Sequence, residues 1–201
     1  MATLTLPDRV PAERTLQRFL TRPAPRSLTF FSLVLPLSLL PPLASLYSLA
    51  HYPGLVLPAI SPAHRLTATL LIGAATLALE WGLVSMMAAQ VLLLGAAPDS
   101  AFEARLNPLA AYRFAGLAPA PLWLASLALF TPSLTLLGLS LLLAWALVAL
   151  LVREGVAGLY QPRTAADARR LGVNLLARGF FAWLVIVAGL LLPLAAMAVL
   201  D

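Results

Sequence analysis

The chain has 201 residues, of which 61% are hydrophobic and only 10% are charged. Soluble domains carry about 25% charged residues, and a single core of this size cannot bury so much apolar surface, so the composition excludes a soluble globular protein. The formal net charge is +5 and every basic residue is Arg; because the arginines flank apolar segments, anionic lipid headgroups are the expected counter-charges, and nucleic acid is not an expected partner.

Five apolar segments are long enough to cross a bilayer, since a membrane-spanning helix needs about 20 residues. We therefore predict an all-α, polytopic membrane protein with an N-terminal segment, residues 1–26, and a five-span domain, residues 27–201. The predicted spans are residues 27–50, 66–94, 114–130, 134–152 and 179–200. Only Thr131-Pro132-Ser133 joins the third span to the fourth, which predicts a tight antiparallel hairpin.

The N-terminal segment predicts a short amphipathic helix over residues 11–22. Arg14, Arg18 and Arg22 recur every four residues on one stripe, and apolar residues lie on another side. A helix of this kind lies on the membrane surface. It is expected either to anchor the segment against anionic headgroups or to dock a partner.

The first span, residues 27–50, is uncharged but is interrupted by Pro36, Pro41 and Pro42. Small residues at Ser48-Leu49-Ala50 are typical of a signal-peptidase site. However, a long polar segment precedes the apolar run, and the run exceeds the roughly 7–15 residues of a signal-peptide core. We therefore expect a retained span.

Glu80 lies in the middle of the second span and is the leading candidate for a functional residue. A carboxyl at that depth costs on the order of 3 kcal/mol on insertion, which the surrounding Leu, Ile and Val residues offset. We expect it to be protonated, or paired inside the bundle. It forms either a proton or cation site or a structural hydrogen bond; its candidate partners are Thr76, Ser126 and Trp145.

Two weaker patterns accompany this residue. Ala74, Ala78 and Gly82 form a row of small residues spaced by four, which predicts either an internal packing face or a dimer face. His51 and His64 fall in the loop after the first span, which lacks Asp, Glu and Cys. Because a usable metal site needs three or four ligands, we expect interfacial histidines and no metal. Because both histidines lie in one short loop, a serine–histidine–acid arrangement is not expected either. We therefore expect no cofactor and no enzymatic activity.

The loop after the second span and the loop after the fourth span each contain a helix-initiation signal. Asn107-Pro108 predicts a helix that leads into the third span. Thr164 precedes Asp167 in a capping-box pattern, with Leu171, Leu175 and Leu176 on one helical face. We therefore expect short interfacial helices in both loops.

The arginines predict the orientation in the membrane. Twelve lie in the N-terminal segment, in the loop after the second span and in the loop after the fourth, and only Arg65 lies on the other side. Because basic loops stay in the cytoplasm, we expect a cytoplasmic N-terminus and an external C-terminus. A candidate lipid- or partner-binding face on the cytoplasmic side comprises Arg14, Arg18, Arg22, Arg169 and Arg170.

The middle of the chain carries a recognisable series of short elements. From Leu109 it reads Leu-Ala-Ala-Tyr-Arg-Phe-Ala-Gly-Leu-Ala-Pro-Ala-Pro-Leu-Trp-Leu-Ala, and it continues through Phe130-Thr131-Pro132 and Leu137-Gly138-Leu139 to Gly155, Gly158 and Gln161-Pro162. This series resembles the Yip family of Ypt-interacting proteins and its bacterial members. The resemblance extends from about residue 65 to residue 162 and does not include the acidic element that eukaryotic members carry before their first span.

The resemblance implies a five-span membrane protein with a cytosolic N-terminus that acts through proteins or lipids and needs no cofactor. Together with the topology, it favours a non-enzymatic protein of a bacterial inner membrane: a membrane-organising, trafficking-like or adaptor component with a membrane-protein partner or as a homo-oligomer. The alternative is a small transporter, channel or lipid-translocating protein that uses Glu80.

Overall fold

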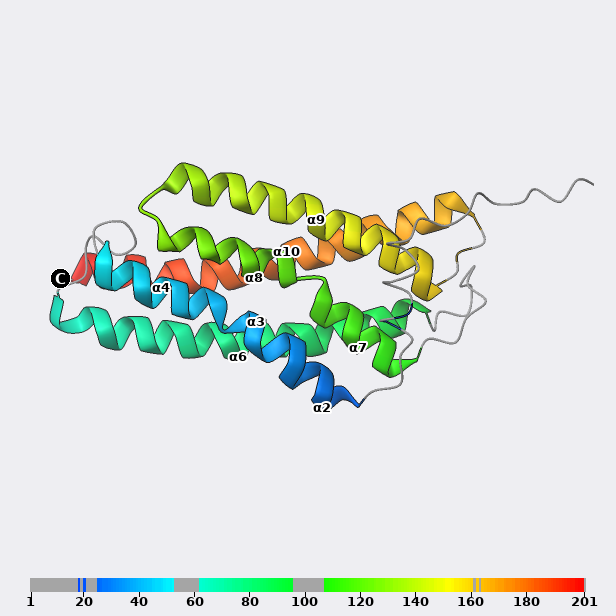
Figure 1. The fold of residues 1–201 in the computed structure, drawn as a ribbon, viewed down its shortest axis with the longest axis horizontal. Helices are drawn as coiled ribbons and strands as arrows, with labels where there is room; N and C mark the ends of the chain where they lie inside the picture. Colours follow the sequence, from blue (N-terminus) through cyan, green and yellow to red (C-terminus); the bar gives the residue numbers. More distant parts are fainter. Residues whose placement is uncertain are drawn as a thin grey trace, which may run out of the picture.

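The computed structural model describes residues 18, 20, 25–52, 62–95, 107–160, 162 and 164–200, and these residues form a bundle of long helices (Figure 1). Five helical segments are long and apolar enough to cross a membrane. The predicted all-α, five-span architecture is therefore confirmed. The segments are Arg26–Ser48, Thr69–Leu94, Pro108–Phe130, Leu134–Tyr160 and Ala165–Ala188.

The first segment is a kinked rod built from four short helices, α2 (Arg26–Thr29), the π-helical η1 (Phe30–Val34), α3 (Leu35–Ser38) and α4 (Leu40–His51). Its prolines explain the irregularity, because a proline has no N–H to donate to the preceding turn. The π turn ends two residues before Pro36, and the break at Leu39 lies two residues before Pro41. A neighbouring helix stabilises the break: the indole of Trp81 donates to the hydroxyl of Ser38 at 2.9 Å.

The second segment is one unbroken helix, α6 (Pro62–Gly95). The third is divided at Pro119 into α7 (Pro108–Leu117) and α8 (Ala120–Ala125), and it ends in the 3₁₀-helix η2 (Ser126–Phe130). Asn107 caps α7 by accepting a hydrogen bond from the amide of Leu109 at 2.9 Å. The predicted helix start at Asn107-Pro108 is therefore confirmed, and the third segment begins earlier than residue 114.

The last two segments, α9 (Leu134–Tyr160) and α10 (Ala165–Leu200), pack against each other as a helical hairpin. The predicted capping box is present: Thr164 accepts from the amide of Asp167 at 3.1 Å and donates to its carboxylate at 2.6 Å. The helix that this box begins does not stop at the interface. It continues into the fifth span, because no proline or other break separates the two parts.

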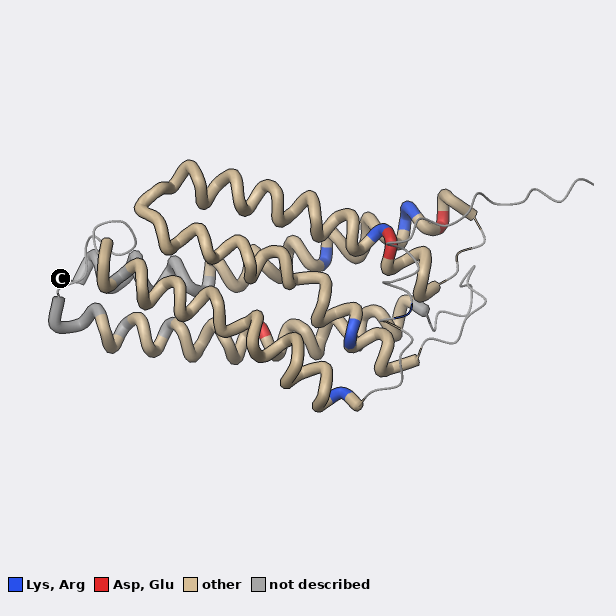
Figure 2. Tube along the Cα trace, viewed as in Figure 1, with Lys and Arg blue, Asp and Glu red and all other residues tan. Residues whose placement is uncertain are grey.

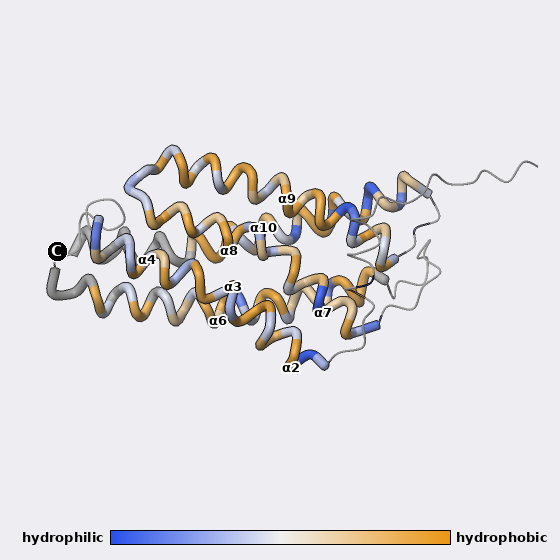
Figure 3. The backbone as a smooth tube through the Cα atoms, viewed as in Figure 1, coloured by the Kyte–Doolittle hydropathy of each residue, from blue (hydrophilic) through white to orange (hydrophobic). Residues whose placement is uncertain are grey.

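The hydrophobic core of the bundle is narrow, and one part of it lies between α6, α7, α9 and α10. Val156 and Tyr160 are fully buried there, and the Tyr160 hydroxyl donates to the carbonyl of Val91 at 2.6 Å. The outward faces carry large apolar side chains instead, such as Leu142 and Phe181, which are 70% and 69% exposed. Figure 3 shows hydrophobic residues along the length of all five segments, as contact with lipid requires.

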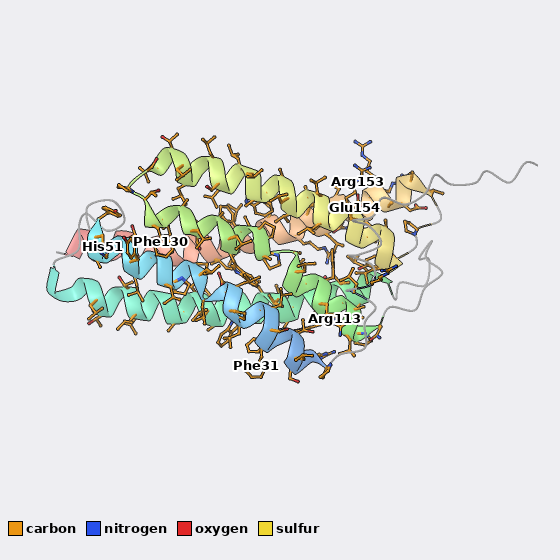
Figure 4. The ribbon with its side chains drawn as sticks, in the orientation of Figure 1. Phe31, His51, Arg113, Phe130, Arg153 and Glu154 are labelled. Carbon is orange, nitrogen blue, oxygen red and sulfur yellow. The ribbon has the colours of Figure 1, made fainter. Side chains whose placement is uncertain are left out.

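Charged residues divide the bundle into two unlike ends. Figure 2 shows the described arginines toward the end where α2, α7 and α10 begin and α6 and α9 terminate. Arg113 and the neighbouring pair Arg153–Glu154, 4.0 Å apart, lie toward that end in Figure 4, whereas His51 and Phe130 lie toward the other. The arginines that are coloured in Figure 2 thus share one end of the bundle.

Candidate functional site

Glu80 lies near the middle of α6, in the interior of the bundle. Its side chain is 9% exposed, and the indole of Trp123 on α8 donates a hydrogen bond to its carboxyl group. The second carboxyl oxygen, Oε2, has no hydrogen-bond partner in the part of the chain that the structure describes. A buried polar atom without a partner is costly, so this oxygen is a candidate contact for a ligand.

Glu80 opens onto a cavity of about 290 Å³ inside the bundle. The cavity lies between α6, the α7–α8–η2 segment, α9 and α10, and Pro41 of α4 also reaches it. Its walls are mainly Leu, Val and Ala side chains. Polar atoms are contributed by Thr76, Glu80, Trp123, Ser126, Trp145 and Trp183. Mainly apolar walls with a few polar groups are typical of small-molecule sites.

The four residues of the predicted intramembrane polar site, Thr76, Glu80, Ser126 and Trp145, all line this one cavity. Among the described residues, Ser126 and Trp145 are not the predicted partners of Glu80. The hydroxyl of Ser126 donates to the carbonyl of Trp123 at 2.6 Å, where it stabilises the junction of α8 and η2. The indole N–H of Trp145 has no hydrogen-bond partner among the described residues.

Trp123 is the residue of this candidate site that the sequence analysis did not include. A signal for it exists, because Trp123 lies three residues before Ser126, and residues with this spacing share a helix face. Once Ser126 was assigned to the interior, Trp123 was the nearest side chain on that face with a hydrogen-bond donor.

An aromatic cluster forms one wall of the site. Trp145 of α9 packs edge-to-face on Phe180 and Trp183 of α10, with ring centroids 5.1 and 5.7 Å apart. Such pairs favour a defined geometry, so the cluster holds the unpaired N–H of Trp145 in a fixed position within the bundle.

The arginine end has a buried anchor that the sequence did not indicate. Arg113 of α7 is 3% exposed; its guanidinium donates to the hydroxyl of Thr29 at 3.4 Å and to the carbonyl of Leu20 at 3.5 Å. Leu20 itself is 2% exposed and packs in the core beside Tyr160 and Leu175. Arg113 therefore holds the end of the N-terminal segment against the bundle.

The predicted arginine face is only partly visible. Arg169 and Arg170 are exposed on α10, and Arg18 is exposed and helical. Arg14, Arg22 and most of the predicted helix over residues 11–22 lie outside the described residues.

The small-residue row of α6 faces outward. Ala74, Ala78 and Gly82 are all exposed, and a Cβ at Gly82 would have no neighbour within 4 Å. Of the two predicted alternatives, the internal packing face is therefore wrong and the dimer face stays a prediction, because the buried stripe of α6 follows Thr76, Glu80 and its helical neighbours instead.

The two histidines do not form a metal site in the described residues. Nδ1 of His51 lies 3.0 Å from the carbonyl of Tyr47, and the two rings are stacked with centroids 4.0 Å apart. The side chain of His64 lies outside the described part, within which no group of three or more possible metal ligands occurs.

No protein family, curated protein or solved structure matches the chain. Its class therefore follows from the fold and the site alone: it is an α-helical membrane protein with five candidate spans and a mainly apolar cavity that contains a buried carboxyl group.

Proposed function

We propose that the chain is a non-enzymatic, Yip-type protein of a bacterial inner membrane that organises the membrane through a lipid-like ligand held inside its helix bundle. The observation that carries the proposal is the cavity of about 290 Å³ with Glu80 at its wall. Its volume is near the lower end of the roughly 300–1,000 Å³ of known ligand sites, so it suits a small molecule or one acyl-type chain.

The chemistry of the walls favours binding over catalysis. Apolar side chains gain from covering an apolar ligand, and the two unpaired polar atoms, Oε2 of Glu80 and Nε1 of Trp145, can orient its polar end. The Yip resemblance gives independent support, because it implies a protein that acts through lipids or protein partners.

The same proposal places the arginine end in the cytoplasm, following the positive-inside rule. Arg169 and Arg170 are exposed there on α10, and together with the N-terminal arginines they would meet anionic headgroups or a partner protein. In this arrangement the cavity lies within the membrane and the arginine face lies in the cytoplasm.

A second candidate function is transport or lipid translocation through Glu80. The unpaired carboxyl oxygen favours it, because intramembrane carboxyl groups are commonly part of ion and proton pathways. The two functions differ in a measurable way: a transporter moves its ligand across sealed liposomes, and Glu80→Gln abolishes that movement, whereas a binding protein retains the ligand without net flux.

Filling the cavity tests the proposal. Gly179 of α10 lines the cavity, and a Cβ at this position would have no neighbour within 4 Å. Gly179→Leu should therefore occupy the cavity without a backbone clash. Gly138→Leu is the matched control, because Gly138 is exposed on α9 and also has open space at its Cβ.

The measurement is native mass spectrometry of the protein released from nanodiscs made with native membrane lipids. We expect a bound small molecule in the wild type and in Gly138→Leu, and at least a tenfold lower occupancy in Gly179→Leu. Equal occupancy in the two variants would contradict a ligand in the cavity.

A further inference from the structure

The cavity contains an acidic side chain, Glu80, and no basic side chain among the described residues that line it. Among the described residues that line it, Glu80 is the one ionisable side chain, and no Arg or His reaches it from α4, α6, α7, α8, η2, α9 or α10. The arginines that approach the bundle interior are engaged elsewhere: Arg178 donates to Asn174 and Gln90, and Arg113 donates to Thr29 and Leu20. Without a counter-charge among the described residues, the buried carboxyl is neutral in the empty cavity, and it can ionise only beside a cationic ligand.

The aromatic lining has the complementary chemistry. Three indole rings, those of Trp123, Trp145 and Trp183, border the cavity, together with the ring of Phe114. The faces of aromatic rings attract cations, and Trp does so best, which is why aromatic residues recur where proteins bind ammonium groups. An anionic headgroup would instead meet a carboxyl and no cation, which is unfavourable in a low-dielectric interior.

We propose that the ligand of this cavity is a lipophilic organic cation: an ammonium group beside the free oxygen of Glu80, and an apolar chain against the surrounding Leu and Val side chains. This inference rests on the proposed ligand-binding function and deepens it by naming the charge of the ligand. Trp123 holds the carboxyl in place from one side, which leaves Oε2 for the cation.

Three probes with the same chain test the charge directly: octyltrimethylammonium, octanol and octyl sulfate. Each is titrated into the full-length protein in nanodiscs of neutral lipid, with tryptophan fluorescence as the readout and empty nanodiscs as the partition control. For the wild type we expect the cation to bind at least tenfold more tightly than octanol, and octyl sulfate to bind more weakly than either. This comparison needs no variant.

Variants then assign the contact. Glu80→Gln should lower the affinity for the cation at least tenfold and leave the affinity for octanol within about twofold. Gly179→Leu should lower the affinity for both probes, and Gly138→Leu should change neither.

The outcomes separate the two proposals. Equal binding of octanol and the cation, with both lost in Gly179→Leu, would overturn the cation and leave the cavity function intact. Absence of binding by every probe, with no effect of Gly179→Leu on the occupancy of the native ligand, would overturn both.

Discussion

The contact between Gly155 of α9 and Phe114 of α7 makes a quantitative prediction for the variant Gly155→Ala. A Cβ at position 155 would lie 2.6 Å from Cδ2 of Phe114 and 2.9 Å from its Cζ, and it would approach Cε2 more closely still. Phe114 is 3% exposed, and Val152 and Val156 surround it. The ring borders the cavity on one side and packs in the core on the others, so the added methyl group forces the ring and its core neighbours to shift.

The magnitude follows from a comparison with Gly138→Ala. Both glycines are inside α9, so both variants share the gain in helix propensity of about 1 kcal/mol. A Cβ at Gly138 meets nothing within 4 Å. The difference between the two variants therefore isolates the cost of overpacking, which is about 1–3 kcal/mol. For a chain of this size that corresponds to roughly 2–12 °C in Tm.

The assay compares the thermal unfolding of the two variants and the wild type in the same detergent. Unfolding is measured as the loss of the fraction that stays monodisperse in size-exclusion chromatography. Gly155→Ala should unfold at or below the wild type, by up to about 2 kcal/mol after the gain in helix propensity, and Gly138→Ala at or above it. The double variant Phe114→Leu/Gly155→Ala should recover part of the loss, because the smaller side chain leaves room for the methyl group. If Gly155→Ala is as stable as Gly138→Ala, the close packing of α7 on α9 is wrong.

Three further predictions concern other parts of the molecule. Tyr160→Phe removes the hydrogen bond to a carbonyl of α6 and should lower stability by about 0.5–1.5 kcal/mol; an unchanged Tm in detergent would contradict this. Arg113→Met removes hydrogen bonds from a buried cation, worth about 1.5–3 kcal/mol each. Trypsin should therefore cleave the segment before α2 at least tenfold faster in this variant than in the wild type. The control Arg153→Met removes a side chain that is 81% exposed and should leave the cleavage rate unchanged. Because the chain has no native cysteine, single cysteines at positions 51 and 170 should react with an impermeant maleimide from opposite sides of the membrane, and labelling from one side would refute the five-span threading.

The parts of the fold that the sequence predicted are those that local physics determines. Apolar runs of sufficient length gave the five spans, because the bilayer requires helices that satisfy their own hydrogen bonds. Caps such as Asn107 and the Thr164–Asp167 box were predictable because the side chain and its amide partner lie within three residues of each other. The interior location of Glu80 followed from the cost of exposing a carboxyl to lipid.

The sequence did not show which face of each helix is buried. Almost every face of α6 is apolar, so the sequence offered no strong stripe to identify the buried side, and the row of Ala74, Ala78 and Gly82 was as compatible with the core as with lipid. Likewise, Arg113 was expected at the interface and is buried, because carbonyl and hydroxyl acceptors from residues far away in the sequence satisfy its guanidinium.

The surroundings of Glu80 are unlike those of a carboxyl group that only fixes helix packing. A carboxyl that served only to fix helix packing should have both oxygens bonded and a closed interior around it, since an empty cavity costs about 24 cal/mol per Å³. In the structure one oxygen is bonded, the other has no hydrogen-bond partner among the described residues, and the side chain lines a cavity of about 290 Å³. The cavity is partly open, and a ligand that covers its apolar walls would stabilise the folded protein. Stability that rises with ligand concentration is therefore the thermodynamic consequence of the site.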